Sequence, residues 1–194
     1  QAAYMPARFE RLTIMNTWLH HPEFEYSKAV QNWIQNWHEG GLFHRQTPDV
    51  ALLLVLSTGL AGRNDVFPHL INGTDPGFEG ATAKIYHGYA APYRGLPDEA
   101  FNGYRRFPLS IPVRAYHNGN GAAQTHHYQT LLNWDEPAHF IWGIEDDVFN
   151  EAWGRKWAQQ MNASFDPIAG AGHFLQSSHG AEVARHLLRR LAQE

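Results

Sequence analysis

Short apolar runs along the chain alternate with segments whose apolar residues recur at helical spacing. Each run is closed by polar residues, which is the pattern of buried strands, and there are three of them: 11–17, 138–143 and 163–168. Helical spacing occurs in three later segments: 124–134, 153–161 and 181–191. The last helix is predicted to be amphipathic, with four apolar residues facing inward: Val183, Leu187, Leu188 and Leu191.

The remaining segments complete the order of elements. Residues 2–11 predict the end of a helix, a turn at proline and the start of a strand, and residues 22–88 predict a mostly helical insertion broken by Gly- and Pro-bearing turns. Residues 89–112, rich in Pro, Tyr and Phe, predict an ordered connection. Strand, helical insertion, helix, strand, helix, strand and helix is the order of an α/β fold. Three parallel strands make a thin sheet for this fold, so we expect the sheet to continue in residues outside the sequence.

Composition and charge restrict the kind of protein. The 194 residues are 43% apolar and 18% charged, which is typical of a globular domain. A net charge of −4 without a basic run argues against nucleic acid or an anionic membrane as partner. The longest apolar stretch, 50–61, is too short and interrupted to span a bilayer. No signal-peptide pattern is present, and the absence of Cys fits a reducing compartment, so we expect a cytoplasmic protein.

Two residues that follow predicted strands carry candidate chemistry. Asp146 comes after the strand 138–143, and His173 follows the strand 163–168 in a Gly-Ala-Gly turn. Taken alone, Asp146 is explained as a turn or helix-cap residue, and His173 as an ordinary histidine in a loop. The carboxyl ends of adjacent parallel strands lie together, however, so the two side chains are expected within hydrogen-bond reach. A carboxylate there fixes the imidazole tautomer and stabilises its charged form.

Several ordered segments extend this pattern to a known family. An acid after the penultimate strand and a histidine after the last is the α/β-hydrolase arrangement. More narrowly, the chain resembles the haloalkane dehalogenases in five segments: 2–9 (AAYMPARF), 14–18 (IMNTW), 89–93 (YAAPY), 105–108 (RRFP) with Pro112, and 172–176 (GHFLQ). The resemblance implies a core strand and helix end at 1–19, a helical cap at 20–88 and the C-terminal hydrolase core at 89–194.

The resemblance also assigns roles to residues. Asp146 takes the position of the catalytic acid and His173 that of the base, while Phe107, Pro108 and Val148 are expected to line the substrate pocket. Members with a Glu acid at the end of the sixth strand would carry it near Asn16, and the Asn there agrees with Asp146 as the acid. No organic cofactor or metal is implied. The doublets among the thirteen histidines match no zinc motif.

The family's nucleophile, an Asp on a strand-turn-helix elbow, has no counterpart in the sequence. The string 73–77 (GTDPG) fits the elbow pattern, but the proline after its Asp lacks the N–H that serves as oxyanion donor. The chain begins with Gln1. Three explanations stay open: a companion N-terminal hydrolase segment supplies the nucleophile, the chain is part of a longer one, or it is a non-catalytic binding module. An unpaired sheet edge and an apolar cap surface favour the companion segment.

The expected reaction is hydrolytic dehalogenation of a small haloalkane. The Asp outside the chain displaces halide to form an alkyl-enzyme ester, and water activated by His173 hydrolyses that ester. The chain alone is expected to be inactive. The alternatives are an epoxide hydrolase or an esterase of the same fold, or an inactive fragment that acts as a binding module.

Overall fold

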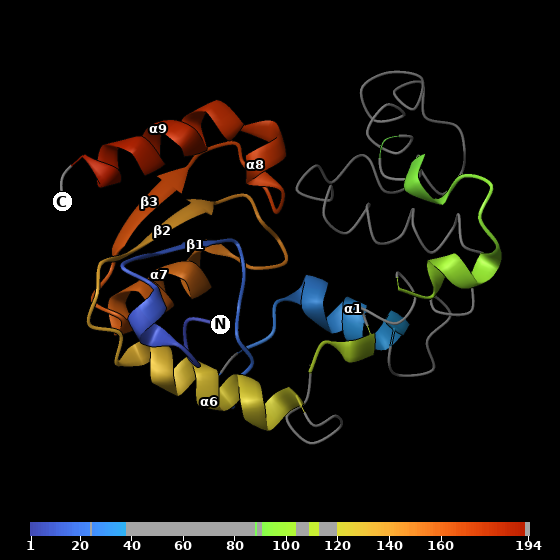
Figure 1. Ribbon diagram of the computed structural model, residues 1–194, viewed down its shortest axis with the longest axis horizontal. Helices are drawn as coiled ribbons and strands as arrows, with labels where there is room; N and C mark the ends of the chain where they lie inside the picture. The colour runs from blue at the N-terminus through green and yellow to red at the C-terminus, as the bar shows by residue number, and fades with distance from the viewer. Residues whose placement is uncertain (24, 38–87, 89–90, 104–108, 113–119, 193–194) are drawn as a thin grey trace. The chain divides into compact units, whose positions relative to one another are not determined.

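The computed structural model describes residues 1–23, 25–37, 88, 91–103, 109–112 and 120–192. The chain divides into two compact units, one formed by Gln1–Lys28 with Pro112–Glu194 and the other by Ala29–Ile111 (Figure 1). In the second unit lie most of helix α1 (Lys28–Trp37) and the short 3-10 helices η3 (Ala91–Tyr93) and η4 (Asp98–Phe101).

The first unit is built on one parallel sheet. Its strands are β1 (Leu12–Met15), β2 (Ala138–Gly143) and β3 (Ser164–Ile168), in the order β1-β2-β3. In register, Leu12 lies opposite Ala138, and His139 lies opposite Ser164. β2 is the central strand and its last five residues are buried, which explains why its sequence is a nearly continuous apolar run.

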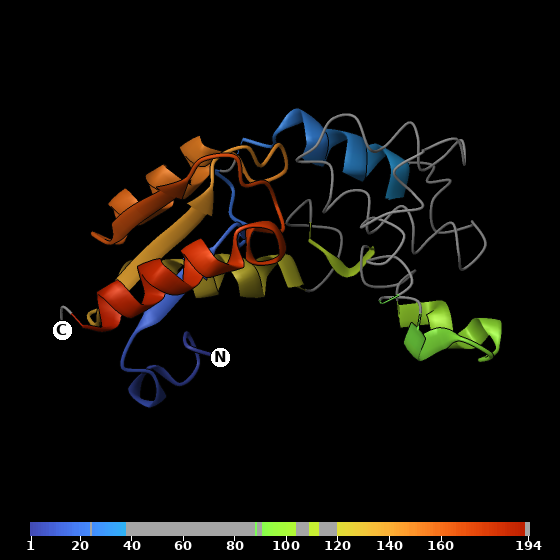
Figure 2. The same ribbon diagram turned by 90° about the horizontal axis from the view of Figure 1, so that it is seen from above.

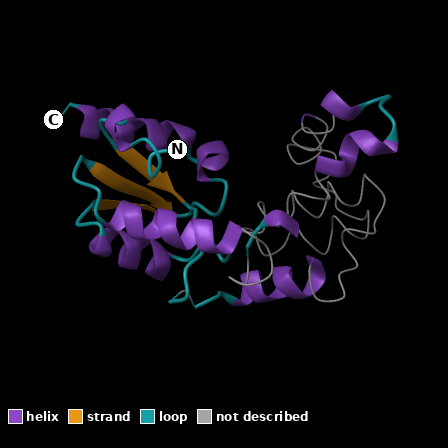
Figure 3. Ribbon diagram, turned by 60° about the horizontal axis from the view of Figure 1, so that its bottom comes forward, coloured by secondary structure: helices purple, strands orange, loops and turns teal. Residues whose placement is uncertain are grey.

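Helices cover both faces of this sheet (Figures 1, 2 and 3). They are α6 (Asn120–Leu132), α7 (Glu151–Gln160), α8 (Leu175–Ser178) and α9 (Gly180–Leu191). On one face, Phe140 and Trp142 pack with Tyr128 of α6 and Trp157 of α7. The core of the other face is formed by five buried residues of the sheet, its following loop and the last two helices: Ile141, Ile168, Ala171, Leu175 and Val183.

The structure confirms the predicted α/β class with three parallel strands. The predicted inward stripe of the last helix is only half right. Val183 is buried and Leu187 packs on the core, but Leu188 is 65% exposed and Leu191 51% exposed. The periodicity identified the apolar side of the helix, whereas the sheet beneath it contacts only part of that side.

The next observations concern the N-terminal segment, the predicted cap and membrane spans. At the N-terminus, Pro6–Arg8 form a short 3-10 helix (η1) before β1. The insertion predicted to be a helical cap falls largely on residues outside the described ranges, as do Phe107 and Pro108. Its boundaries therefore stay a prediction. In the part of the chain that is described, no helix is long and apolar enough to cross a membrane.

Candidate functional site

Asp146 lies three residues beyond the end of β2, and its side chain is fully buried. Oδ1 accepts hydrogen bonds from the backbone N–H groups of Val148 (2.8 Å) and Phe149 (3.1 Å). Oδ2 accepts from Asn16 Nδ2 (2.8 Å) and lies 2.9 Å from His173 Nδ1. An ionised carboxylate has about four acceptor positions, so these four donors fill its capacity.

His173 follows β3 on the turn that begins at Gly170, whose φ of +75° is the left-handed conformation that favours glycine. Its side chain is 20% exposed, and its ring lies 5.1 Å from that of Phe149 and 5.3 Å from that of Phe174. Because the Asp146 carboxylate can only accept, Nδ1 is the nitrogen that donates. Nε2 is then the basic nitrogen of the neutral ring, able to take a proton from water.

Two hydrogen bonds of Glu145 bring the loops after β2 and β3 together. Glu145 N–H donates to the Ala171 carbonyl (3.0 Å), and the Glu145 side chain accepts from Gly170 N–H (3.1 Å). Gly143 makes this approach possible, because a Cβ at its position would lie 2.6 Å from the carbonyl oxygens of Ala171 and Gly172. The separation between acid and base is therefore set by backbone packing as well as by their own hydrogen bond.

Asn16, directly after β1, holds the acid from the other side. Its Nδ2 also donates to the Gly143 carbonyl (3.0 Å), and its Oδ1 accepts from Gly143 N–H (2.7 Å). The residue is 6% exposed and has φ +29°, a backbone region that Asn tolerates better than most residues. The sequence pattern was used at Asn16 only to show that no acid stands there, and the role of Asn16 in holding Asp146 was missed. The sign of that role in the sequence was a polar side chain at the end of a buried strand.

Val148, predicted to line the pocket, is half-buried in the loop after Asp146. Its carbonyl accepts a hydrogen bond from Ser27 Oγ (2.8 Å), and the next carbonyl, of Phe149, accepts from Trp142 Nε1 (2.8 Å). The loop is thus anchored by its backbone. A pocket-lining role for Val148 remains a prediction, as does the catalytic role of Asp146 and His173.

A second polar cluster contains two adjacent buried histidines, His20 (4% exposed) and His21 (3% exposed). His20 Nδ1 is 2.8 Å from the Tyr26 hydroxyl, while the His21 ring stacks on Tyr128 with centroids 3.8 Å apart. Burial lowers the pKa of both, that of His21 to about 4. Both rings are therefore neutral at pH 7. Among the described residues, no three His, Asp or Glu side chains are grouped so that they could hold a metal ion.

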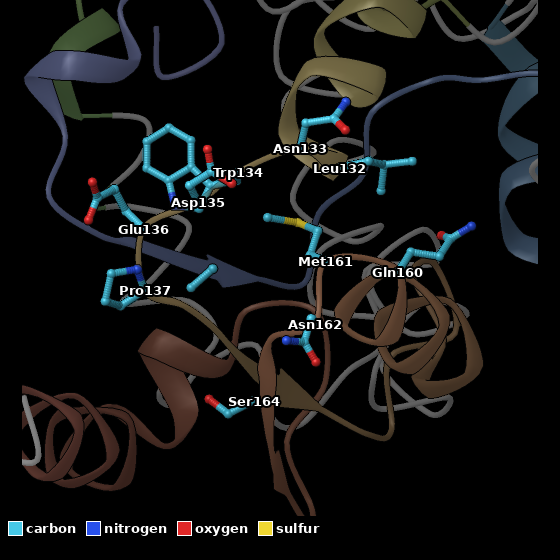
Figure 4. Close-up of a pocket in the computed structure, with 11 residues that line it drawn as sticks. Leu132, Asn133, Trp134, Asp135, Glu136, Pro137, Gln160, Met161, Asn162 and Ser164 are labelled. Carbon is cyan, nitrogen blue, oxygen red and sulfur yellow. The ribbon is translucent and has the colours of Figure 1, made fainter.

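A cavity at the opposite end of the sheet is shown in Figure 4. Its lining comes from the end of α6, the start of β2, the end of α7 and the start of β3, and includes Trp134, Glu136, Gln160 and Ser164. The acid and base follow the carboxyl ends of the strands, whereas this cavity surrounds their amino ends. It is therefore separate from the Asp146–His173 pair.

Comparison with known proteins identifies the fold. No protein-family model and no curated protein matches the chain. Among solved structures, the haloalkane dehalogenase DbeA from Bradyrhizobium elkani USDA94 is similar with a TM-score of 0.68 and 18% identity, over 99% of this chain and 62% of its own. A putative ancestral haloalkane dehalogenase is similar with a TM-score of 0.68 and 17% identity, over the same shares. A meta-cleavage product hydrolase, CumD, has a TM-score of 0.54 and 10% identity, over 100% of this chain and 59% of its own.

These likenesses confirm the predicted resemblance at the level of the fold. The similarity extends over 99% of the chain. The chain spans about 62% of the length of the dehalogenases it matches. It has the α/β-hydrolase fold, and its structural neighbours are hydrolases, haloalkane dehalogenases among them.

Proposed function

We propose that the chain is part of a hydrolase that cleaves the carbon–halogen bond of small haloalkanes through an alkyl-enzyme ester. The observation that carries the proposal is the 2.9 Å contact between a fully buried carboxylate and a partly exposed imidazole at adjacent strand ends. Such a pair serves a hydrolase as base and orienting acid. The similarity to haloalkane dehalogenase structures supports the choice of substrate class.

In the first step, an Asp supplied by residues outside this chain attacks the halogen-bearing carbon of the substrate. One carboxylate oxygen forms a bond to that carbon, and the halide leaves with the electron pair of the broken bond. The product is a covalent ester between the enzyme and the alkyl group. His173 takes no part in this step, so a variant without its imidazole should still form the ester.

In the second step, His173 Nε2 removes a proton from a water molecule whose oxygen attacks the ester carbonyl carbon. The bond between that carbon and the alkyl oxygen breaks, and the alkoxide takes the proton of the newly formed carboxylic acid. The alcohol leaves, the carboxylate is restored, and His173 releases its proton to solvent. His173 becomes positively charged when it holds the proton. Asp146, 2.9 Å away, stabilises that charge and keeps the ring oriented.

The variant His173→Phe tests the proposal. With a chlorinated or brominated alkane, it is expected to release about one equivalent of halide and to retain the alkyl group, seen as a mass increase on the polypeptide carrying the nucleophile. His126→Phe, on the exposed side of α6, is the matched control and should turn over normally. Unchanged turnover by His173→Phe would exclude the assigned base.

Other hydrolases use the same pair on different substrates. Hydrolysis of an epoxide or an ester without halide release would indicate one of these instead. The identity of the nucleophile residue also separates a dehalogenase from an esterase. An Asp followed by Trp indicates a dehalogenase, and a Ser indicates an esterase. Absence of all three activities from the natively purified protein would favour a binding module.

A further inference from the structure

The His173 imidazole is held at one edge by a carboxylate and lies beside two phenyl rings. Its Nδ1 is 2.9 Å from Asp146 Oδ2, and its ring centroid is 5.1 Å from that of Phe149 and 5.3 Å from that of Phe174. A hydrogen bond to one ring atom leaves the ring able to turn, because the torsion that rotates an imidazole has broad energy minima. The direction of Nε2 therefore also depends on the groups that lie against the ring.

Phe149 is held both at its backbone and at its ring. Its N–H donates to Asp146 Oδ1 (3.1 Å). Its ring centroid lies 5.9 Å from that of Trp18 and 5.9 Å from that of Trp153, with interplanar angles of 33° and 26°. These distances lie within the range of about 4.5–7 Å over which aromatic pairs attract each other. The ring that meets His173 is thus held in turn by two larger rings.

The three rings come from different parts of the chain and form one aromatic cluster, made of Trp18, Phe149 and Trp153. Trp18 lies in the loop after β1, Phe149 in the loop after β2, and Trp153 in the first turn of α7. The two tryptophan rings are stacked at 5.9 Å, so each ring of the cluster contacts the other two. Trp153 is 8% exposed, and the other two are half-buried. The cluster therefore joins the loop after β1 to the loop that carries the acid.

Trp18 is supported from its other neighbours by polar aromatic residues of the same segment. The rings of Tyr26 and His20 meet it edge-on, at 5.5 and 5.6 Å, and the Tyr26 hydroxyl lies 2.8 Å from His20 Nδ1. Ser27 Oγ of this segment also donates to the Val148 carbonyl (2.8 Å), beside Phe149. The segment after β1 thus contacts the acid loop through a ring and through a hydrogen bond.

We propose that the aromatic cluster orients the base, with Trp18 and Phe149 as positioning residues. Phe149 limits the rotation of the His173 ring, and Trp18 keeps Phe149 against it. This inference rests on the proposed function, in which His173 acts only in the second step. The cluster keeps Nε2 directed at the water that attacks the ester, and it has no part in the displacement of halide. Its effect is large enough to measure, because misplacing a reacting group by 1 Å can lower a rate about a hundredfold.

A merely structural role would affect the two steps differently. Phe149 also packs on the buried core cluster of its sheet face, so loss of a ring near it removes apolar contacts and lowers stability. A general loosening of the fold would slow halide release and ester hydrolysis together. Positioning of the base slows ester hydrolysis alone.

The test is single-turnover kinetics on the natively purified protein, with any companion polypeptide retained. With a brominated alkane, Trp18→Leu is expected to release the first equivalent of halide at the wild-type rate and to hydrolyse the ester about tenfold more slowly. Trp18→Phe keeps an aromatic ring and should restore most of that rate. Trp134→Leu is the matched control, because Trp134 is also half-buried and packs on the same core cluster, but at the opposite end of the sheet. It should leave both rates unchanged.

A second measurement reports on the ring without the reaction. In protein with isotope-labelled His and Phe, nuclear Overhauser effects between the ring protons of His173 and Phe149 are expected in the wild type. They should weaken in Trp18→Leu and persist in Trp18→Phe and Trp134→Leu. Where Trp18→Leu does not fold, Phe149→Leu takes its place in the kinetic test and should slow ester hydrolysis about tenfold as well.

Three results would overturn the inference: equal slowing of both steps, ester hydrolysis at the wild-type rate in both leucine variants, or unchanged Overhauser effects in Trp18→Leu. The first would give the rings a structural role only. Failure of the proposed function is separate. Weakened Overhauser effects without an alkyl-enzyme in His173→Phe would remove the reaction and keep the positioning of the ring, whereas trapped ester with unchanged Overhauser effects would do the reverse.

Discussion

Replacing Asn16 by Ala tests whether the acid is held by the end of β1. The side chain makes three hydrogen bonds, two with the backbone of Gly143 and one with Asp146 Oδ2. Ala can make none of them, and the site is nearly closed to solvent, since Asn16 is 6% exposed. The substitution thus leaves a buried N–H without an acceptor and a buried carboxylate with three donors in place of four.

The magnitude follows from those losses. An unsatisfied buried N–H costs about 1–3 kcal/mol, and a hydrogen bond to a charged group contributes about 1.5–3 kcal/mol. The φ of +29° adds about 1 kcal/mol, because Ala tolerates the left-handed region less well than Asn. Neighbouring losses are not additive and water can enter the gap, so we expect the free energy of unfolding to fall by about 3–5 kcal/mol.

Urea unfolding measures this difference, and pH separates its causes. Asn133→Ala is the control, because its exposed side chain makes a comparable 2.9 Å bond to the Gln129 carbonyl and should matter by about 0.5 kcal/mol or less. Asn16→Asp keeps an acceptor for Gly143 N–H but sets a second carboxylate against Asp146, so it should be less destabilising at pH 4 than at pH 7. A loss below about 1 kcal/mol for Asn16→Ala would refute the reasoning.

Three further predictions concern stability. Gly143→Ala should lower the free energy of unfolding by about 1–3 kcal/mol, because its Cβ meets two carbonyl oxygens at 2.6 Å; in Gly180→Ala, where no atom lies within 4 Å, urea unfolding should detect no loss. Burial lowers the pKa of His21 to about 4, so the stabilisation from its neutral form is complete above about pH 6.5 and declines toward pH 4. His21→Gln should therefore make the urea midpoint depend less on pH between about pH 4 and about pH 6.5. The same pH dependence in the variant and the wild type would contradict this. Burial raises the pKa of Asp166, but Arg190 with its neighbouring cations brings it below the ordinary value; Asp166→Asn should therefore destabilise at pH 7, and the difference from wild type should shrink below about pH 4.

Much of the fold was predictable because parallel strands are buried on both faces. The run 138–143 was predicted as a strand with the bounds it has in the structure, since such a strand needs apolar residues throughout. The pairing of Asp146 with His173 was predictable for a topological reason. Strand ends in a parallel sheet meet at one edge, so residues 27 positions apart come within 2.9 Å.

Long-range partners were not predictable in the same way. Asn16 binds a residue 127 positions away and the acid 130 positions away, and no local pattern specifies such a contact. The exposure of Leu188 and Leu191 was missed for another reason. Periodicity shows which residues share a side of a helix, but the width of the covered stripe depends on the surface packed against it.

The two carboxylate oxygens of Asp146 bind different parts of the site, so the orientation of His173 depends on other residues that contact Asp146. Oδ1 accepts from the backbone N–H groups of Val148 and Phe149, two and three residues further along the chain, so the local turn can orient the carboxylate by itself. Oδ2 joins the end of β1, through Asn16, to the loop after β3, through His173. The orientation of the imidazole thus depends on contacts that His173 itself does not make. Changes at Asn16 or in the Asp146 turn should therefore alter the orientation of the ring while leaving its own loop intact.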